Sequence, residues 1–196
     1  MLAALTGLTF HLSTLFRMDA YFGALFPMPV VIAAARHGDG AARRVMLIAS
    51  LLLFVISGPL RSMNYLFLHG VMAYTLGALW NRRRTWWVTI PASAAARSAG
   101  IFGSLILSSL ILRENVMGLL VTQMYGLLDQ VAANIGATFM PSIGWVWAIA
   151  VFFVLVNSLS YVVILHAVYT IVLGVVVRPD YVNAPPKVKK MLGVTT

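Results

Sequence analysis

Six long apolar segments, separated by short polar or charged breaks, follow one another along the chain. They are Leu2–Phe16, Tyr21–Ala35, Val45–Ile56, Tyr65–Trp80, Trp87–Leu112 and Trp145–Val177. A helix needs about 20 apolar residues to cross a bilayer, and lipid tolerates only backbone whose polar groups are paired. The pattern therefore predicts an all-α integral membrane bundle of six transmembrane helices.

One further segment, 116–138, is also apolar and long enough to cross the membrane. A seventh span would carry Lys187–Lys190 to the side opposite the other basic loops. Helical spacing places Gln123, Gln130 and Asn134 on one face of this segment. We therefore expect an interfacial or re-entrant helix here.

Composition and charge agree with a membrane protein and set its topology. Hydrophobic residues make up 61% of the chain and charged residues 10%, against about 25% charged in a soluble domain. Ten of the 14 Lys and Arg residues fall in the loops 36–44 and 81–85 and in the C-terminal segment from Arg178. Positive loops stay in the cytoplasm, so both termini are expected on the cytoplasmic or stromal side. We divide the chain into a transmembrane domain, 1–178, and a basic tail, 179–196.

Several classes of function lack the residues they need. The net charge of +9 lies in short clusters between apolar segments rather than on one basic face, so no nucleic-acid partner is predicted. The chain has no cysteine, and no carboxylate or second histidine stands at metal-ligand spacing from His69 or His166. We expect both histidines to be satisfied interior donors. No catalytic constellation or phosphate-binding loop is recognisable, and we predict no enzyme, cofactor or metal.

The fifth apolar segment holds a permanent charge, Arg97, beside a ridge of small residues. The ridge recurs every four residues and consists of Ala92, Ala96, Gly100, Ser104 and Ser108. Such ridges let helices pack closely in a bilayer. Arg97 is then either a structural tie, to Asp129 or to carbonyls freed by Pro91, or an anion site on a ligand pathway.

Two further groups are candidate sites. Glu114 and Asn115 end the fifth segment and are either an ordinary helix terminus or the rim of a ligand cavity under 116–138. In the second case Arg97, Tyr125 and Asp129 would join them as ligand-binding residues. Another group, Ala3 and Gly7, forms a small-x-x-x-small pair that indicates helix docking, inside the bundle or with a partner protein.

Three stretches of the chain carry a family resemblance: "FPMPVVIAAARHG", "LLLFVISGPLRSMNYLFLHGVMAYTLGALW" and "ARSAGIFGSLILSSLILRENVMGLL". Over residues 20–135 the chain resembles the YybS-like family of uncharacterised multi-span membrane proteins, closest to plastid and cyanobacterial members. That family is in turn similar to the substrate-binding S components of energy-coupling-factor transporters. The resemblance implies a six-helix protein that binds a small molecule near the outer face, and a docking motif on the first helix that Ala3 and Gly7 match loosely.

Two functions follow as hypotheses. The first is a substrate-capture subunit of a small-molecule transport system, with a transporter T component as partner. The second is a non-catalytic structural or assembly subunit of a larger membrane complex, plausibly photosynthetic. Both place the protein in the lipid bilayer among other integral membrane proteins, in a plastid (thylakoid) membrane or in a bacterial or cyanobacterial one.

Overall fold

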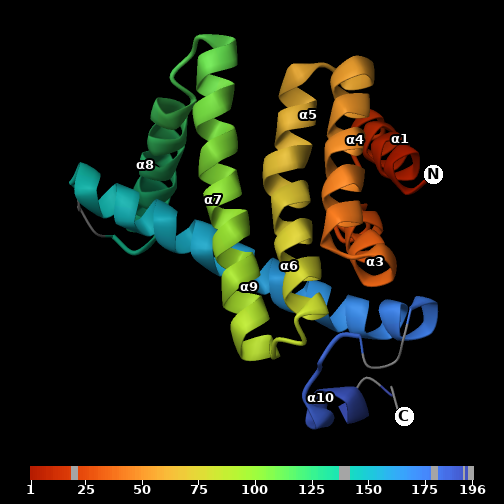
Figure 1. The fold of residues 1–196 in the computed structure, drawn as a ribbon. Helices are drawn as coiled ribbons and strands as arrows, with labels where there is room; N and C mark the ends of the chain where they lie inside the picture. The colour runs from red at the N-terminus through yellow and green to blue at the C-terminus, as the bar shows by residue number, and fades with distance from the viewer. Residues whose placement is uncertain (19–21, 137–141, 178–180, 192, 194–196) are drawn as a thin grey trace.

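The computed structural model describes residues 1–18, 22–136, 142–177, 181–191 and 193, and these residues form helices and connections (Figure 1). The helices are α1 (Leu2–Leu15), α3 (Met28–His37), α4 (Asp39–Ser57), α5 (Pro59–Tyr65), the π-helical turn η1 (Leu66–Gly70), α6 (Val71–Asn81), α7 (Trp86–Leu112), α8 (Val116–Asn134), α9 (Ile143–Val176) and α10 (Pro186–Met191). The prediction of an all-α fold is confirmed for these residues.

Every predicted apolar segment contains a helix, but the helices differ in their ability to span. Four of those described, α4, α7, α8 and α9, are long and apolar enough to cross a membrane. By contrast, α1 has 14 residues and α3 has 10. The predicted count of six spans is therefore not confirmed, and α8, expected in the interface, has the length and composition of a span.

The α5, η1 and α6 helices run on from one another without a break from Pro59 to Asn81. At 1.5 Å per residue this continuous segment is roughly 35 Å long, close to the thickness of the hydrocarbon core. It begins directly after Gly58, whose φ of 87° is open to glycine but strained for other residues. The tight turn at Gly58 returns the chain antiparallel to α4.

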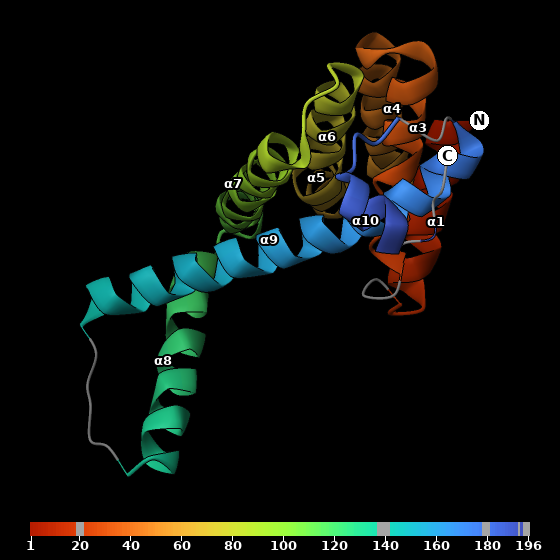
Figure 2. The same ribbon diagram turned by 90° about the horizontal axis from the view of Figure 1, so that it is seen from below.

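The helices form a packed bundle from which one arm extends. Contacts join α1 to α4, α4 to α3 and α5, α3 to α6, and α6 to α7, so these helices lie side by side (Figure 1). The 34-residue α9 crosses the base of the bundle at a steep angle (Figure 1). Seen from below, α8 and the first half of α9 extend away from the bundle (Figure 2), and α8 buries none of its residues.

The main core lies where α9 crosses α6 and α7. Trp80 of α6 is fully buried, with its ring centroid 6.2 Å from that of Tyr169 and 5.1 Å from the His166 imidazole. The Thr89 hydroxyl and His166 Nε2 lie 2.8 Å apart, and His166 Nδ1 lies 2.8 Å from the Val162 carbonyl oxygen. Both nitrogens of His166 are thus paired, which confirms the prediction for this histidine.

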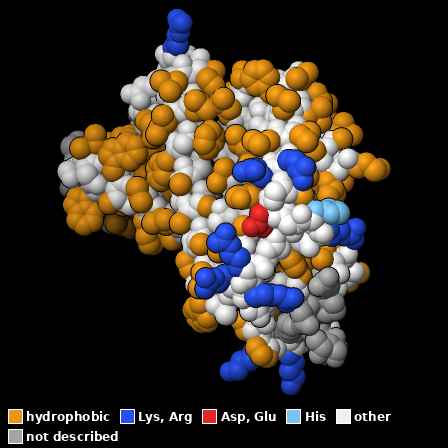
Figure 3. All heavy atoms as spheres, in the orientation of Figure 1, with side chains coloured by type: hydrophobic (Ala, Val, Ile, Leu, Met, Phe, Trp, Pro, Cys, Tyr) orange, Lys and Arg blue, Asp and Glu red, His pale blue; other side chains and the backbone are white. Residues whose placement is uncertain are grey.

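The loops that charge assigned to one side do meet at one end of the bundle. The Asn81 amide donates to Asp39 at 2.7 Å, and the Tyr181 hydroxyl donates to Asn81 Oδ1 at 2.9 Å. Burial raises the pKa of Tyr181, so this phenol remains a neutral donor. Lys and Arg side chains gather over the lower part of the face in Figure 3, while hydrophobic side chains cover most of the rest. We call the end of the bundle where the loops 36–44 and 81–85 meet the segment from Tyr181 the basic end.

The backbones of η1 and α7 approach each other closely at Gly100. A Cβ atom added to Gly100 would lie 2.0 Å from the Phe67 carbonyl oxygen, closer than any real contact. Only glycine fits between these two backbones, so Gly100 fixes the separation of η1 and α7. The predicted small-residue ridge has its tightest contact here.

This contact predicts opposite effects for one substitution at two glycines. We expect Gly100→Ala to lower the free energy of unfolding by about 1–3 kcal/mol, because α7 must move away from η1. Gly126 of α8 has nothing within 4 Å of an added Cβ. Gly126→Ala should therefore leave stability unchanged or raise it by about 0.5–1 kcal/mol. Unfolding of both variants in detergent, followed by tryptophan fluorescence, checks this; equal effects would contradict the close approach.

Because the chain contains no cysteine, single cysteines can report its topology. We expect Arg84→Cys and Lys187→Cys, both at the basic end, to react with a membrane-impermeant maleimide from the same side of sealed vesicles. Glu114→Cys, in the connection between α7 and α8, should react from the opposite side. Labelling of all three from one side would rule out this orientation of α7.

Candidate functional site

Arg97 lies on α7 at the crossing with α9, and two α9 side chains hold it. Its guanidinium carbon lies 3.9 Å from the centroid of the Tyr161 ring, a cation–π contact, and its Nη2 donates to Asn157 Oδ1 at 3.4 Å. The Tyr161 hydroxyl donates to the Gly23 carbonyl at 2.6 Å. Arg97 Nε and Nη1 are buried without a hydrogen-bond partner. The charge is therefore placed by the protein and only partly satisfied by it.

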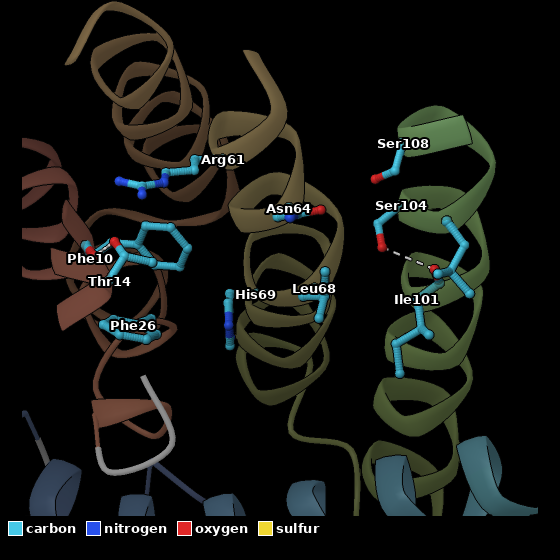
Figure 4. Close-up of a pocket in the computed structure, with 11 residues that line it drawn as sticks. Phe10, Thr14, Phe26, Arg61, Asn64, Leu68, His69, Ile101, Ser104 and Ser108 are labelled. Carbon is cyan, nitrogen blue, oxygen red and sulfur yellow. Dashed lines mark hydrogen bonds between the residues drawn. The ribbon is translucent and has the colours of Figure 1, made fainter. Parts of the chain in front are cut away.

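A cavity of about 430 Å³ lies between α1, the start of α3, the α5–η1 segment and α7 (Figure 4). Phe10 of α1 and Phe26, just before α3, give it an aromatic wall, Ile101 and Leu105 of α7 add apolar surface, and polar side chains come from α1, α5, η1 and α7. The lining residues are Phe10, Thr14, Phe26, Arg61, Asn64, Leu68, His69, Ile101, Ser104, Leu105 and Ser108. Its volume lies within the ~300–1,000 Å³ range of small-molecule sites.

His69 stands deep in this cavity, inside the π-helical turn. Its ring centroid lies 5.2 Å from that of Phe26 and 6.1 Å from that of Phe10, both edge to face, and 6.4 Å from that of Tyr161. The ring Nδ1 is buried and has no hydrogen-bond partner. The prediction that His69 is a satisfied interior donor is therefore wrong. Single π-turns inside α-helices are frequent at functional sites.

Polar groups gather toward the other end of the cavity. Arg61 and Asn64 lie on α5 near the Gly58 turn, and Ser108 lies opposite them on α7 (Figure 4). Arg61 is exposed, which marks this end as the mouth. Because α4 and the α5–α6 segment each run from here to the basic end, the mouth lies at the end of the bundle opposite the basic loops.

The structure does not bring the predicted ligand-binding residues together. Glu114, Asn115 and Asp129 are exposed, and Tyr125 is half-buried on α8. None of the four lines the cavity. Asn115 instead caps α8, because its side-chain oxygen accepts from the Gly118 N–H at 2.8 Å. The predicted Arg97–Asp129 tie is also replaced, since Arg97 contacts Asn157 and Tyr161.

The two packing motifs lie where helices meet inside this chain. Ala3 and Gly7 are buried, and a Cβ on Gly7 would lie 2.7 Å from the Leu52 side chain of α4. The face expected to dock a partner is thus covered by α4. Along the ridge, Gly100 meets η1, Ala92 and Ala96 are half-buried, and Ser104 and Ser108 line the cavity.

Sequence reasoning missed Arg61, Asn64 and the aromatic residues Phe10 and Phe26. One signal was present: Arg61 and Asn64 are three residues apart, and on a helix such residues share a face. Both residues lie in the polar break between the apolar segments Val45–Ile56 and Tyr65–Trp80, outside every predicted span. The arrangement can bind and orient a small molecule; in the described lining no nucleophile is paired with a general base.

A double-mutant cycle checks the Arg97 contact. We expect Arg97→Met and Tyr161→Leu to couple by about 0.5–2 kcal/mol in unfolding free energy, because each removes the same cation–π pair. Tyr161→Phe keeps the ring and loses only the bond to Gly23. Its coupling to Arg97→Met should be close to zero, and an equal coupling for both Tyr161 variants would show that the ring does not hold the charge.

Comparison with known proteins gives a family and no named relative. A family model described as "Predicted membrane protein (DUF2232)" matches residues 4–143. No curated protein and no solved structure matches the chain. The match extends over α1 to α8, the helices that enclose the cavity included, and agrees with the predicted resemblance at the level of a membrane-protein family. The chain belongs to the DUF2232 family of predicted membrane proteins.

Proposed function

We propose that the protein is a membrane-embedded binding protein that captures a small molecule, as a substrate-capture subunit of a transport system does. One observation carries this proposal: a cavity of about 430 Å³ whose lining joins the aromatic rings of Phe10, Phe26 and His69 to the hydrogen-bonding side chains of Arg61 and Asn64.

The form of the cavity supports capture from one side. Its apolar wall, formed by Phe10 and Phe26, suits an apolar ligand body, and its polar groups lie near the mouth. A mouth opposite the basic end faces away from the cytoplasm if positive loops remain inside. The S-component resemblance implies the same placement, and with it a transporter partner in a plastid, cyanobacterial or bacterial membrane.

A structural or assembly role remains the second candidate, because of α8. This helix is apolar enough to span yet buries none of its residues. Its exposed polar side chains include Gln123, Asp129 and Gln130. Polar groups exposed to hydrocarbon are costly, so a partner helix that paired with them would stabilise α8.

Two adjacent residues of α7 allow a sharp test of capture. Leu105 lines the cavity, whereas Ile106 is 52% exposed on the outer surface. Full-length protein is purified in mild detergent from native membranes, and its bound small molecules are identified by mass spectrometry. We expect a metabolite in stoichiometric amount from wild type and from Ile106→Trp. Leu105→Trp should reduce it at least tenfold, because the indole fills the cavity.

If both variants retained equal amounts of the co-purified molecule, it would bind outside the cavity, and the cavity would not be the capture site. A preparation that contains no small molecule but a stoichiometric set of other membrane proteins would favour the second candidate. Thermal unfolding of both Trp variants controls for misfolding, since each adds the same side chain to the same helix.

A further inference from the structure

Two arginines lie at the two ends of the cavity. Arg61 lines its mouth, and its guanidinium extends toward the side of the cavity on which Thr14 and Phe10 lie (Figure 4). At the closed end, the His69 ring is followed by the Tyr161 ring, and Arg97 lies 3.9 Å from the Tyr161 centroid. Arg97 is half-buried between α7 and α9, where the dielectric constant is low and a charge is felt over a longer distance than in water, whereas Arg61 is exposed at the mouth.

The described carboxylates lie elsewhere and do not neutralise these cations. Asp39 accepts from Asn81 at the basic end, and Glu114 and Asp129 are exposed in the α7–α8 connection and on α8. The cavity lining given above contains Arg61 and His69 but no acidic side chain. Charges inside a membrane protein are usually paired, and an unpaired one is costly. Within the described lining Arg61 therefore has no acidic partner, and Arg97, which lies outside the lining, contacts the neutral side chains of Tyr161 and Asn157.

The lining offers a ligand N–H donors at the mouth, whereas the hydroxyls of Thr14 and Ser104 can only accept from it. Arg61 carries only donors, and the Asn64 amide adds two more. The hydroxyls of Thr14 and Ser104 already donate to backbone carbonyls, of Phe10 at 2.6 Å and of Ile101 at 3.0 Å. Arginine donors match the two oxygens of a carboxylate or phosphate group, and the pair gains from charge as well as geometry.

We infer that the cavity selects an organic oxyanion, a molecule with an apolar body and a carboxylate or phosphate head. The apolar body packs between Phe10, Phe26 and Ile101, and the head meets Arg61 and Asn64 at the mouth. Arg97 lies behind Tyr161 and favours the same sign of charge without touching the ligand, so it is a positioning residue. This inference rests on the proposed function and names the ligand class of the same site.

Three probes with one body and different charge test the inference: 2-naphthoate, neutral 2-naphthamide and the 2-naphthylmethylammonium cation. Calorimetric titration of the full-length protein in detergent gives their affinities. We expect naphthoate to bind roughly 10-fold or more tightly than the amide, the size of one charge-assisted hydrogen bond, and the cation to bind most weakly. Adding phosphatidylglycerol or free glycerol phosphate as competitor then distinguishes a lipid headgroup from a soluble oxyanion.

Variants assign the selectivity to residues. Arg61→Gln should remove the preference for naphthoate over naphthamide, and Arg61→Lys should keep most of it. Arg113→Gln, an exposed arginine outside the lining, is the matched control and should change nothing. Arg97→Gln should weaken naphthoate binding less than Arg61→Gln does, and leave naphthamide binding unchanged. A merely structural Arg97 would lower thermal stability without altering the ratio of the two affinities.

Two results would overturn the inference. Equal affinities for the three probes, all lost in Leu105→Trp, would show a cavity that binds without regard to charge, and capture would still stand. Binding of none of the probes by wild-type protein would also reject the oxyanion class as represented here. The co-purification test with Leu105→Trp and Ile106→Trp decides the proposed function separately.

Discussion

The close approach of η1 to α7 at Gly100 separates the packed core of the bundle from its cavity. On one side of this contact α6 and α7 remain packed toward the basic end, and α9 crosses them through the Thr89–His166 pair. On the other side, one face of α7 with Ile101, Ser104, Leu105 and Ser108 lines the cavity. A side chain at residue 100 would separate the backbones and open the packed half as well.

In a membrane the protein surface is apolar, so polar side chains within the spans lie inside the protein, and this placement accounts for the polar groups around the cavity. Hydrophobic side chains cover most of the surface outside the basic end, as Figure 3 shows for one face. Polar side chains within the spans must therefore find partners inside the protein or lose free energy. Thr89 and His166 find each other, whereas His69 Nδ1 and two nitrogens of Arg97 do not. The second group lies at and behind the closed end of the cavity, which is the site of the proposed ligand.

Sequence reasoning could predict what depends on local pattern. Apolar segments gave the helices, and the clustering of Arg43, Arg84 and their neighbours identified loops that the structure brings to one end. Gly100 could be expected to pack closely, because small residues at four-residue spacing have that role in membranes. What could not be predicted depends on contacts between distant segments. Phe10 and Phe26 join a site with Arg61 only because α1, α3 and α5 all pack on α4, and the π-turn around His69 has no sequence signature.

The two interpretations of Arg97 offered by the sequence are not exclusive in this structure. Its contacts with Tyr161 and Asn157 tie α7 to α9, which is a structural role. Yet a tie alone does not require a permanent charge, since a neutral side chain could pack on the same ring without the cost of burying a cation. The tyrosine that receives the guanidinium lies between it and His69, so the tie also holds positive charge behind the cavity floor. An arginine that both locks a helix crossing and biases the adjacent cavity toward anions accounts for its presence in a span better than packing does.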